Sequence, residues 1–356
     1  MLEAREYQTR IVKAALTHLS GNAKTASVLI ESPTGSGKSV MGLMICQALQ
    51  KKHGYTIGWS AMRRNLLTQV ARENIEKSFN VKMVFISMFD KNPPKVDVLV
   101  VDEAQHDSTS SMTFVHTRIK PKIVVGLTAT PYRSDRLGLC FDKIIKDCGI
   151  HQLIYDGFLS KYHHYTIDAF TPESVAQVYL SDPEKWGKSV VFFHKIQQCR
   201  KIKALLDKAG VRTELVTATS DKEEQLAAFE NGDVDVLINM MILVEGFDSP
   251  SLQTVFVRPS TKGCTVQMAG RVFRKYPGLA YKQIVQCKAT KYSFLRHAKP
   301  TEQYSQENGV WRSLTPNAKI DQIAAASVKA IAAAVVEFNP ASLTGFRKKM
   351  SFNDFD

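Results

Sequence analysis

The sequence lacks any apolar run long enough to cross a membrane, and it contains no C-x-x-C pair. A transmembrane helix needs about 18 or more consecutive apolar residues, and structural zinc sites are commonly built on C-x-x-C spacing. The first residues, MLEAREYQ, show none of the apolar stretch that marks a secretory signal. We therefore expect no membrane association, no structural zinc site and, with six dispersed cysteines, a reducing, cytoplasmic setting.

The charge of the chain is unbalanced, because 47 Lys and Arg residues stand against 34 Asp and Glu residues, a formal net charge of +13. A basic chain of this size usually meets a polyanion, either nucleic acid or an acidic membrane surface, although the same charge can serve solubility alone. Residues 301–356 hold as many basic as acidic side chains. The surplus therefore lies on the preceding folded body, which favours a binding groove over a basic tail.

Short apolar runs that alternate with helical patterns predict an α/β protein of two lobes. The length of 356 residues fits two domains of roughly 150 residues each and a short extra piece. In the first part we expect strands at Ala26–Glu31, Val96–Val101 and Lys122–Leu127 and a helix at Lys38–Lys52. Apolar strands separated by helices indicate a parallel sheet that is covered on both faces.

The pattern restarts after residues 158–187, which have no clear periodicity and contain Pro172, Pro183 and Gly187. Further strands and helices are expected in turn at Ser189–Phe193, Gln198–Ala209, Thr213–Thr217, Asp221–Glu230, Asp235–Met240, Thr254–Val257, Thr265–Lys275 and Lys282–Gln286. We assign residues 1–160 to the first lobe, 161–187 to a linker and the entry to the second lobe, and 188–300 to the second lobe. Ligands of multi-domain proteins tend to bind between such lobes.

Residues 301–356 are assigned to a C-terminal helical extension. Its stretch Ala318–Phe338 is rich in alanine, begins after Thr315-Pro316 and ends at Asn339-Pro340, which are typical helix start and stop residues. We expect this helix to pack against the second lobe, and a surface for a partner is the alternative.

A phosphate-binding loop is predicted at residues 32–39, SPTGSGKS, which follow a strand and open a helix. Its glycines let backbone amides surround phosphate oxygens, and the helix N-terminus adds positive potential. The candidate nucleotide-binding residues are Thr34, Gly35, Ser36, Gly37, Lys38 and Ser39. Lys38 is expected to reach the β- and γ-phosphates and Ser39 to hold Mg²⁺. Ser32 replaces the first glycine of the usual pattern, and an ordinary glycine turn is the alternative.

Two adjacent carboxylates, Asp102 and Glu103, end the apolar strand VDVLVV. Such a pair is costly to place at the end of a buried strand without a cation. Asp102 is therefore expected to bind Mg²⁺, directly or through water, and Glu103 to act as general base on the attacking water. A surface acid pair at the start of a loop is the alternative. Together with the phosphate loop, these residues predict nucleotide hydrolysis.

With both sites in place, the sequence resembles the superfamily 2 helicases, whose motifs occur in the right order over residues 1–290. In the first lobe the matching strings are Arg5-Glu6-Tyr7-Gln8, Pro33–Ser39, Ala61-Met62-Arg63-Arg64, Asp102-Glu103-Ala104-Gln105 and Thr128-Ala129-Thr130. The resemblance implies two tandem RecA-like lobes with parallel sheets, a P-loop NTPase fold. It also implies that Gln8 reads adenine with support from Arg5, and that Gln105, Thr128 and Thr130 couple lobe closure to a nucleic-acid groove.

In the second lobe the matching strings are Phe192-Phe193-His194, Glu245-Gly246-Phe247-Asp248 and Gln267-Met268-Ala269-Gly270-Arg271-Val272-Phe273-Arg274. The resemblance implies that Gln267, Arg271 and Arg274 belong to the catalytic set, with both arginines acting on the γ-phosphate. It further implies that Asp248 contacts the ribose and that Gly246 allows close backbone approach. We interpret Phe192-Phe193 as strand core, with a base-stacking wedge as the alternative.

The closest resemblance is to the RadD-like bacterial helicases and compact phage-encoded relatives, through the strings GLTATPYR, EGFDSP, RPS and QMAGRVFR. Gln105 stands where those relatives have histidine, and His106 follows it, so we expect Gln105 to contact Gln267. The cysteine-rich C-terminal region of RadD-like proteins has no counterpart here, and its function is not transferred.

These observations predict an ATP-dependent DNA helicase or translocase that uses ATP and Mg²⁺, works as a monomer and acts in a bacterial or phage-infected cell. The candidate contacts to DNA phosphates are Arg63, Arg64, Arg133 and Lys262, each with a solvated surface charge as the alternative. Single-stranded or branched DNA is the preferred partner, since DEAD-box RNA helicases carry D-E-A-D where this chain has D-E-A-Q. The alternatives are a remodeller that does not separate strands, an RNA helicase and a nucleotide-gated clamp with negligible turnover.

Overall fold

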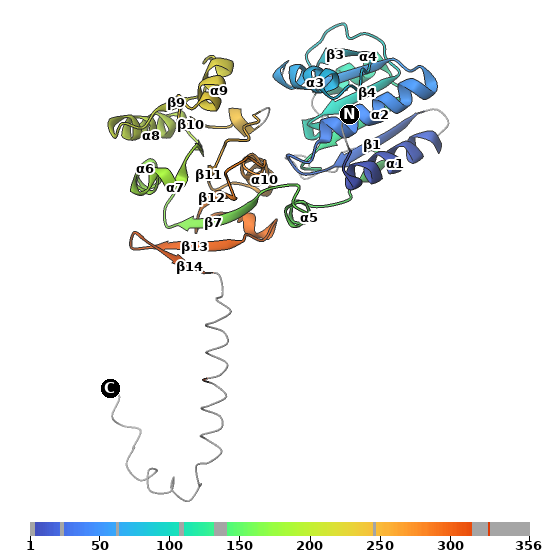
Figure 1. Ribbon diagram of the computed structural model, residues 1–356. Helices are drawn as coiled ribbons and strands as arrows, with labels where there is room; N and C mark the ends of the chain where they lie inside the picture. The colour runs from blue at the N-terminus through green and yellow to red at the C-terminus, as the bar shows by residue number, and fades with distance from the viewer. Residues whose placement is uncertain are drawn as a thin grey trace, which may run out of the picture. The chain divides into compact units, whose positions relative to one another are not determined.

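A computed structural model of the chain describes residues 4–21, 25–61, 64–106, 110–131, 141–244, 247–314 and 327. Residues 1–312 form one compact unit, which contains two sheets, and residues 313–356 form a second unit. The predicted helix at Ala318–Phe338 lies outside the described residues, apart from Ser327. The two sheets of the first unit confirm the predicted α/β class with parallel sheets and flanking helices (Figure 1).

The first lobe is built on a parallel sheet with the strand order β3-β2-β4-β5-β1-β6. Its strands are β1 (Ala26–Glu31), β2 (Ile57–Ala61), β3 (Met83–Ser87), β4 (Val98–Asp102), β5 (Ile123–Thr128) and β6 (Lys143–Ile145). Its helices are α1 (Glu6–Gly21), α2 (Lys38–His53), α3 (Arg64–Glu76), the 3-10 turn η1 (Ala104–His106) and α4 (Ser110–Ile119).

Both faces of this sheet are buried, as its continuous apolar strands predict. Alternate residues of a strand point to opposite faces. Val28 and Ile30 of β1 join the apolar cluster that contains residues of α1 and α2, whereas Leu29 joins a separate cluster with Met112 and Val115 of α4. Helices therefore cover both faces, and the loops at the carboxyl ends of the strands remain available for function.

The second lobe is built on an eight-stranded sheet with the order β14-β13-β7-β12-β11-β8-β10-β9. Its strands are β7 (Lys161–Ile167), β8 (Ser189–Phe192), β9 (Thr213–Leu215), β10 (Val236–Asn239), β11 (Thr254–Val257), β12 (Tyr281–Cys287), β13 (Glu302–Glu307) and β14 (Val310–Ser313). Its helices and 3-10 turns are α6 (Pro172–Ser181), α7 (Pro183–Trp186), α8 (Ile196–Lys208), α9 (Lys222–Asn231), η2 (Ile242–Val244), α10 (Lys262–Gly270) and η3 (Phe294–Arg296). Phe192 and Phe193 are fully buried, so the prediction that they belong to the strand core is confirmed.

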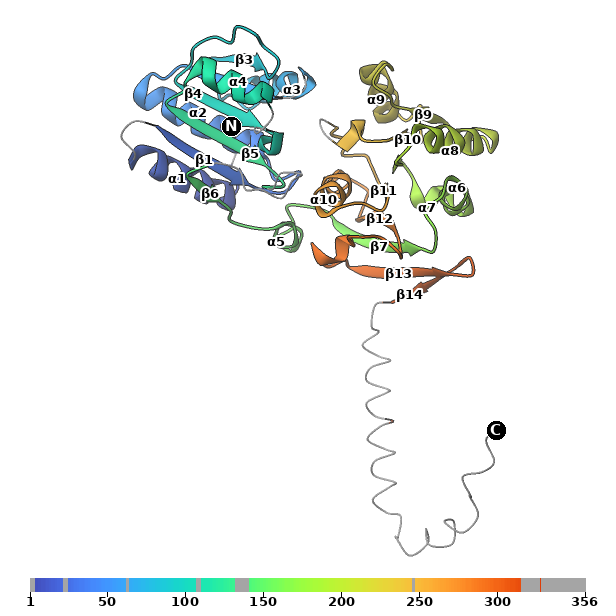
Figure 2. The ribbon, with the colours of Figure 1, turned by 180° about the vertical axis from the view of Figure 1, so that it is seen from behind.

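The predicted linker at residues 161–187 is wrong for most of its length. β7 pairs in parallel with both β12 and β13, inside the second sheet, and α6 packs on α8 (Figure 2). The connection between the two sheets instead spans residues 146–160 and contains α5 (Ile150–Tyr155). The strand sequence KYHHYTI has no apolar run, because its buried side chains are Tyr162, His164 and Tyr165 with Ile167 as the one aliphatic residue among them.

The start of the predicted C-terminal helical extension is also wrong, because residues 302–313 form β13 and β14. Asn308 and Gly309 connect these strands, and both have positive φ, as in the tight turn of a β-hairpin. Within the described residues, no helix has the length and apolar character that a membrane crossing requires.

Candidate functional site

The phosphate loop lies at the carboxyl end of β1, where residues 32–37 lead into α2. Gly35 and Gly37 both have φ of 81°, in the left-handed region that favours glycine. Ser32, which replaces the usual first glycine, donates a hydrogen bond from its hydroxyl to the Ser36 hydroxyl at 2.7 Å. Since Gly37 is the N-cap residue of α2, it brings no side chain to cap the first amides of that helix. The loop therefore has the local conformation that phosphate binding requires.

Side chains at the start of α1 hold this loop in place. The Tyr7 hydroxyl and the Gln8 side-chain amide both donate to the Ser36 carbonyl, at 2.5 and 2.9 Å. Gln8 also accepts a bond from the Arg5 backbone amide at 3.0 Å. A side chain at Gly37 would collide with the Gln8 amide, at 2.6 Å. The residues expected to read adenine are thus built against the phosphate loop, and Tyr7 is a support that sequence reasoning missed.

Asp102 and Glu103 are both buried at the carboxyl end of β4, the strand two places from β1 in the sheet. Burial and the neighbouring Glu103 carboxylate raise the pKa of Asp102 to about 7, while Lys38 acts in the opposite direction. Glu103 has a φ of 52°, which is uncommon for a residue other than glycine and typical of strain at a functional site. A divalent cation would offset this crowding of negative charge, and the oxygen donors of Asp102 and Ser39 are of the type that Mg²⁺ prefers.

A chain of hydrogen bonds leads from Glu103 to the loop after β5. The Gln105 amide donates to the Glu103 carboxylate at 3.0 Å, and the Thr128 hydroxyl donates to the Gln105 carbonyl oxygen at 2.6 Å. The Thr130 backbone amide donates in turn to the Thr128 hydroxyl at 2.9 Å. The residues expected to couple the lobes are therefore directly connected to the expected general base.

The predicted contact between Gln105 and Gln267 is not formed. Among the residues that the structure describes, no hydrogen bond joins the two amides, because Gln105 is held within the first lobe by Glu103 and Thr128. Gln267 is buried in α10 of the second lobe.

Arg271 and Arg274 follow α10 and contact the segment before β11. Arg271 is buried and donates to the Phe247 carbonyl at 3.0 Å. Arg274 forms an ion pair with Asp248, and both side chains are one-third exposed. Asp248 is thus engaged with an arginine, and its expected contact with a ribose stays a prediction.

Charged groups of both lobes meet at Lys38. Burial lowers the pKa of Lys38. The carboxylates of Glu103 and Asp102 in the first lobe raise this pKa, whereas Arg271 and Arg274 of the second lobe lower it. The lobes also approach closely at the loop itself, because a side chain on Gly270 would lie 3.2 Å from Thr34. The other four charged residues predicted for catalysis are therefore all within electrostatic range of Lys38.

The expected nucleic-acid contacts are mostly untested by the structure. Arg63 and Arg133 lie outside the described residues, as does the side chain of Arg64 at the start of α3. Gly246, which is expected to allow close backbone approach at the nucleotide, lies outside them as well. Lys262 is exposed at the start of α10.

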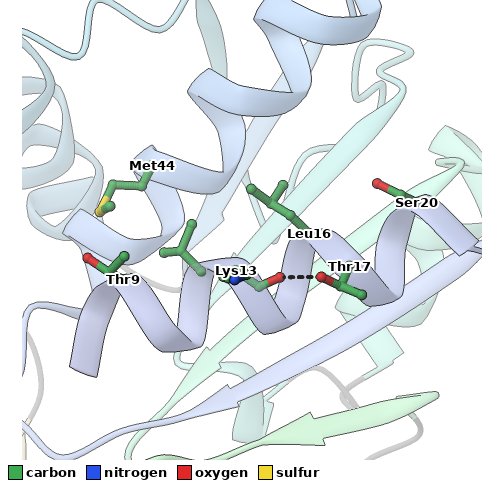
Figure 3. Close-up of a pocket in the computed structure, with 7 residues that line it drawn as sticks. Thr9, Lys13, Leu16, Thr17, Ser20 and Met44 are labelled. Atoms are coloured by element: carbon green, nitrogen blue, oxygen red, sulfur yellow. Dashed lines mark hydrogen bonds between the residues drawn. The ribbon is translucent and has the colours of Figure 1, made fainter. Parts of the chain in front are cut away.

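One cavity of the described part of the chain has a lining that includes none of these residues (Figure 3). It is a groove of about 600 Å³ beside α1, lined by Val12, Lys13 and Leu16, with Met44 of α2 at one end. Thr9, Thr17 and Ser20 complete its lining. No charged side chain other than Lys13 lines it, so it offers none of the chemistry of the phosphate loop.

Comparisons with known protein families match each lobe to a helicase domain. Residues 25–127 match the Schlafen group 3 DNA/RNA helicase domain, and residues 172–276 match the helicase conserved C-terminal domain. A curated relative, the Saccharomyces cerevisiae protein named as ATP-dependent helicase IRC3, is 24% identical over 342 residues, covering 76% of this chain and 49% of the relative. The chain spans between about half and three-fifths of the length of the curated relatives that it matches.

Solved structures share the fold. The type ISP restriction-modification enzyme LlaBIII bound to DNA has a TM-score of 0.59 and 17% identity, covering 82% of this chain and 28% of the enzyme. Dbp5 of Saccharomyces cerevisiae, bound to RNA and ADP with BeF3, has a TM-score of 0.57 and 12% identity, covering 91% and 97% of the two chains.

Proposed function

We propose that this chain, a member of the superfamily 2 helicases, is a nucleic-acid-dependent ATPase that moves along or unwinds DNA. The observation that carries the proposal is that Asp102 and Glu103 of one lobe and Arg271 and Arg274 of the other all act electrostatically on Lys38, beside a close approach of Gly270 to Thr34. Each of these residue types has a defined task in phosphoryl transfer. A site shared between lobes can be completed and dismantled by their relative motion, which is what a motor requires.

The proposed chemistry follows from the position of each side chain. Lys38 neutralises the β- and γ-phosphates, and the buried Glu103 carboxylate accepts the proton of the attacking water. Gln105 holds that carboxylate from the side through its 3.0 Å hydrogen bond. Ser39 and Asp102 would hold Mg²⁺, which neutralises charge on the phosphates when bound.

The second lobe supplies positive charge to the transferred phosphoryl group. A positioned arginine is worth roughly 10³-fold or more in the rate of such reactions. To contact the γ-phosphate, Arg274 has to leave its ion pair with Asp248 or bind both groups at once. The Glu103–Gln105–Thr128–Thr130 chain would carry the state of the nucleotide toward the nucleic-acid groove.

DNA is the proposed track because the D-E-A-Q string departs from the D-E-A-D of the RNA-helicase families. The fold alone does not favour either polymer, since similar solved structures are bound to DNA in one case and to RNA in another. A translocase that remodels complexes without separating strands remains the second candidate. The buried Glu103 and the two arginines argue against a clamp with negligible turnover.

Steady-state ATP hydrolysis by the purified chain tests the proposal, measured alone and with single-stranded, duplex and forked DNA and with RNA. We expect stimulation by a DNA form, followed by strand separation on that form. Lys38→Ala should lose turnover and keep nucleic-acid binding, because only the phosphate site is changed. Stimulation by RNA alone would reverse the choice of track, and tight binding of ATP and DNA without any turnover would support the clamp.

A further inference from the structure

The connection between the lobes makes contacts that its chain position alone would not predict. The segment Phe158–Ser160 follows α5 and immediately precedes β7, so it is the last stretch before the second sheet (Figure 2). We call these three residues the strap. The backbone amides of Phe158 and Leu159 both donate to the Leu153 carbonyl, at 2.8 and 2.9 Å. The strap is therefore hydrogen-bonded to α5 through its backbone.

The first residue of the strap packs on the residues expected to read the base. The Phe158 ring lies edge-on to the Tyr7 ring with centroids 5.4 Å apart, and the Arg5 guanidinium lies 5.0 Å from the Phe158 centroid. Such ring–ring and cation–ring contacts are attractive and hold the Phe158 ring against both side chains. A movement of Arg5 or Tyr7 on nucleotide binding would therefore displace Phe158 as well.

The second residue of the strap packs on the phosphate loop. Leu159 is 2% exposed and belongs to the same apolar cluster as Tyr7, Met41 and Phe273. A side chain on Gly35 would lie 3.1 Å from a Leu159 methyl group, which shows how closely Leu159 approaches the loop. Because packed interiors leave little free space, a displacement of the loop has to move Leu159 as well.

The third residue of the strap contacts the arginine segment of the second lobe. The Ser160 backbone amide donates to the Phe273 carbonyl at 2.9 Å, and its hydroxyl makes a longer contact of 3.5 Å to the Arg274 carbonyl. Three consecutive residues reach at most about 10 Å when extended. Within that reach the strap joins the base-reading residues and the phosphate loop to the backbone that carries Arg274.

We propose that Phe158, Leu159 and Ser160 are positioning residues that couple recognition of the nucleotide base to the placement of Arg274. An adenine held by Gln8 and Arg5 fixes the positions of Phe158 and Leu159. Ser160 then fixes the position of the Phe273 and Arg274 backbone. A nucleotide with another base can bind the phosphate loop but does not fix the position of the strap. Base identity should therefore affect turnover itself and not only binding. The inference rests on the proposed ATPase function.

The test compares kcat and KM for ATP and GTP at a saturating level of the stimulating nucleic acid. For the unmodified chain we expect kcat with ATP to exceed kcat with GTP by about tenfold, the equivalent of one well-made hydrogen bond. Leu159→Ala should reduce this kcat ratio to less than about twofold, since the loop can then move without the strap. Leu159→Met, which conserves volume, should restore the ratio.

Leu49→Ala is the matched control, because Leu49 is also a buried leucine of the first lobe but lies near the far end of α2 from the phosphate loop. It should lower stability and leave the ratio of kcat values unchanged. Phe158→Ala provides a second variant if Leu159→Ala fails to fold, because Phe158 is only partly buried and its loss should also reduce the ratio.

Three results would overturn the coupling. The kcat ratio could stay intact in Leu159→Ala and Phe158→Ala, it could fall equally in Leu49→Ala, or the unmodified chain could turn over ATP and GTP at equal kcat. Absence of any turnover by the unmodified chain is a different result, which would overturn the proposed function and the coupling with it.

Discussion

Arg274, a candidate catalytic residue, forms an ion pair with Asp248. Arg274→Ala should leave ATP binding nearly intact and lower the turnover of bound ATP by about 10³-fold, because the loss concerns charge that develops in the transition state. ATP affinity and single-turnover rates measured on the same preparation check this prediction. Arg274→Lys is the matched variant, and it should restore only part of the rate because an ammonium group lacks the planar fork of guanidinium.

Asp248→Asn is the control that tests whether loss of the ion pair alone explains the effect of Arg274→Ala. It removes the attraction that holds Arg274 and preserves the shape of the side chain, so it should not reproduce the loss seen in Arg274→Ala. If Arg274→Ala instead destroyed ATP affinity while bound ATP turned over normally, Arg274 would be a binding residue and the proposed role would be wrong.

At the scale of single residues, the sequence points to candidate groups for the chemistry but not to the side chains that hold them. Lys38, Asp102 and Glu103 follow from a strand that ends in a phosphate loop or a carboxylate pair, which is a local pattern. Gln105 bonds to Thr128, 23 positions away, and Tyr7 bonds to Ser36, 29 positions away. Such contacts depend on which strands are neighbours in the sheet, and strand order is not written in any local pattern.

At the scale of elements, a fully buried lysine fixes the loop that leads into β11. Lys282 of β12 is 0% exposed and donates to the carbonyls of Pro250 and Leu252, at 2.7 and 2.5 Å. Burial lowers its pKa to about 8, with Glu230 acting in the opposite direction. The loop is thus held by two hydrogen bonds from Lys282, although burial makes the charged form of this side chain less favourable than in water.

This buried lysine gives a pH dependence of stability with a definite sign. A lysine in the unfolded chain has a pKa of about 10.4, so between about pH 8 and pH 10.4 the unfolded state binds more protons than the folded state. The contribution of Lys282 to the free energy of unfolding should therefore increase as pH rises through this window. Urea unfolding of the unmodified chain and of Lys282→Met at pH 7.5 and pH 10 measures the difference. A difference that does not change with pH would show that Lys282 titrates normally.

The errors at the scale of elements have physical causes. The hairpin of β13 and β14 is predictable from the sequence, since Asn308-Gly309 is a strong two-residue turn pattern. β7 could not be predicted from apolar periodicity, because the strand buries Tyr162, His164 and Tyr165. His164 is compensated by a 3.0 Å contact with Gln286, and burial lowers its pKa to about 4.

At the scale of the whole molecule, the charge distribution sets how the chain should meet a polyanion. The net charge of +13 lies outside residues 301–356 and therefore on the body that holds the two lobes. A motor has to move over any sequence, so its contacts should be to phosphates, and those contacts release counterions. We expect binding to fall steeply with salt and to depend little on base sequence.

The salt dependence of binding also distinguishes residues that contact the nucleic acid from residues of the ATP site. The slope of log K against log salt should be about −0.7 per phosphate contact on single strands and about −0.9 on duplex DNA, so titrations on both give the number of contacts. Lys262→Ala should reduce the slope by about one contact if this exposed lysine at the start of α10 meets a phosphate. Lys38→Ala removes the same charge from the nucleotide site and should leave the slope unchanged. An equal effect of both substitutions would mean that net charge, and not a defined groove, governs binding.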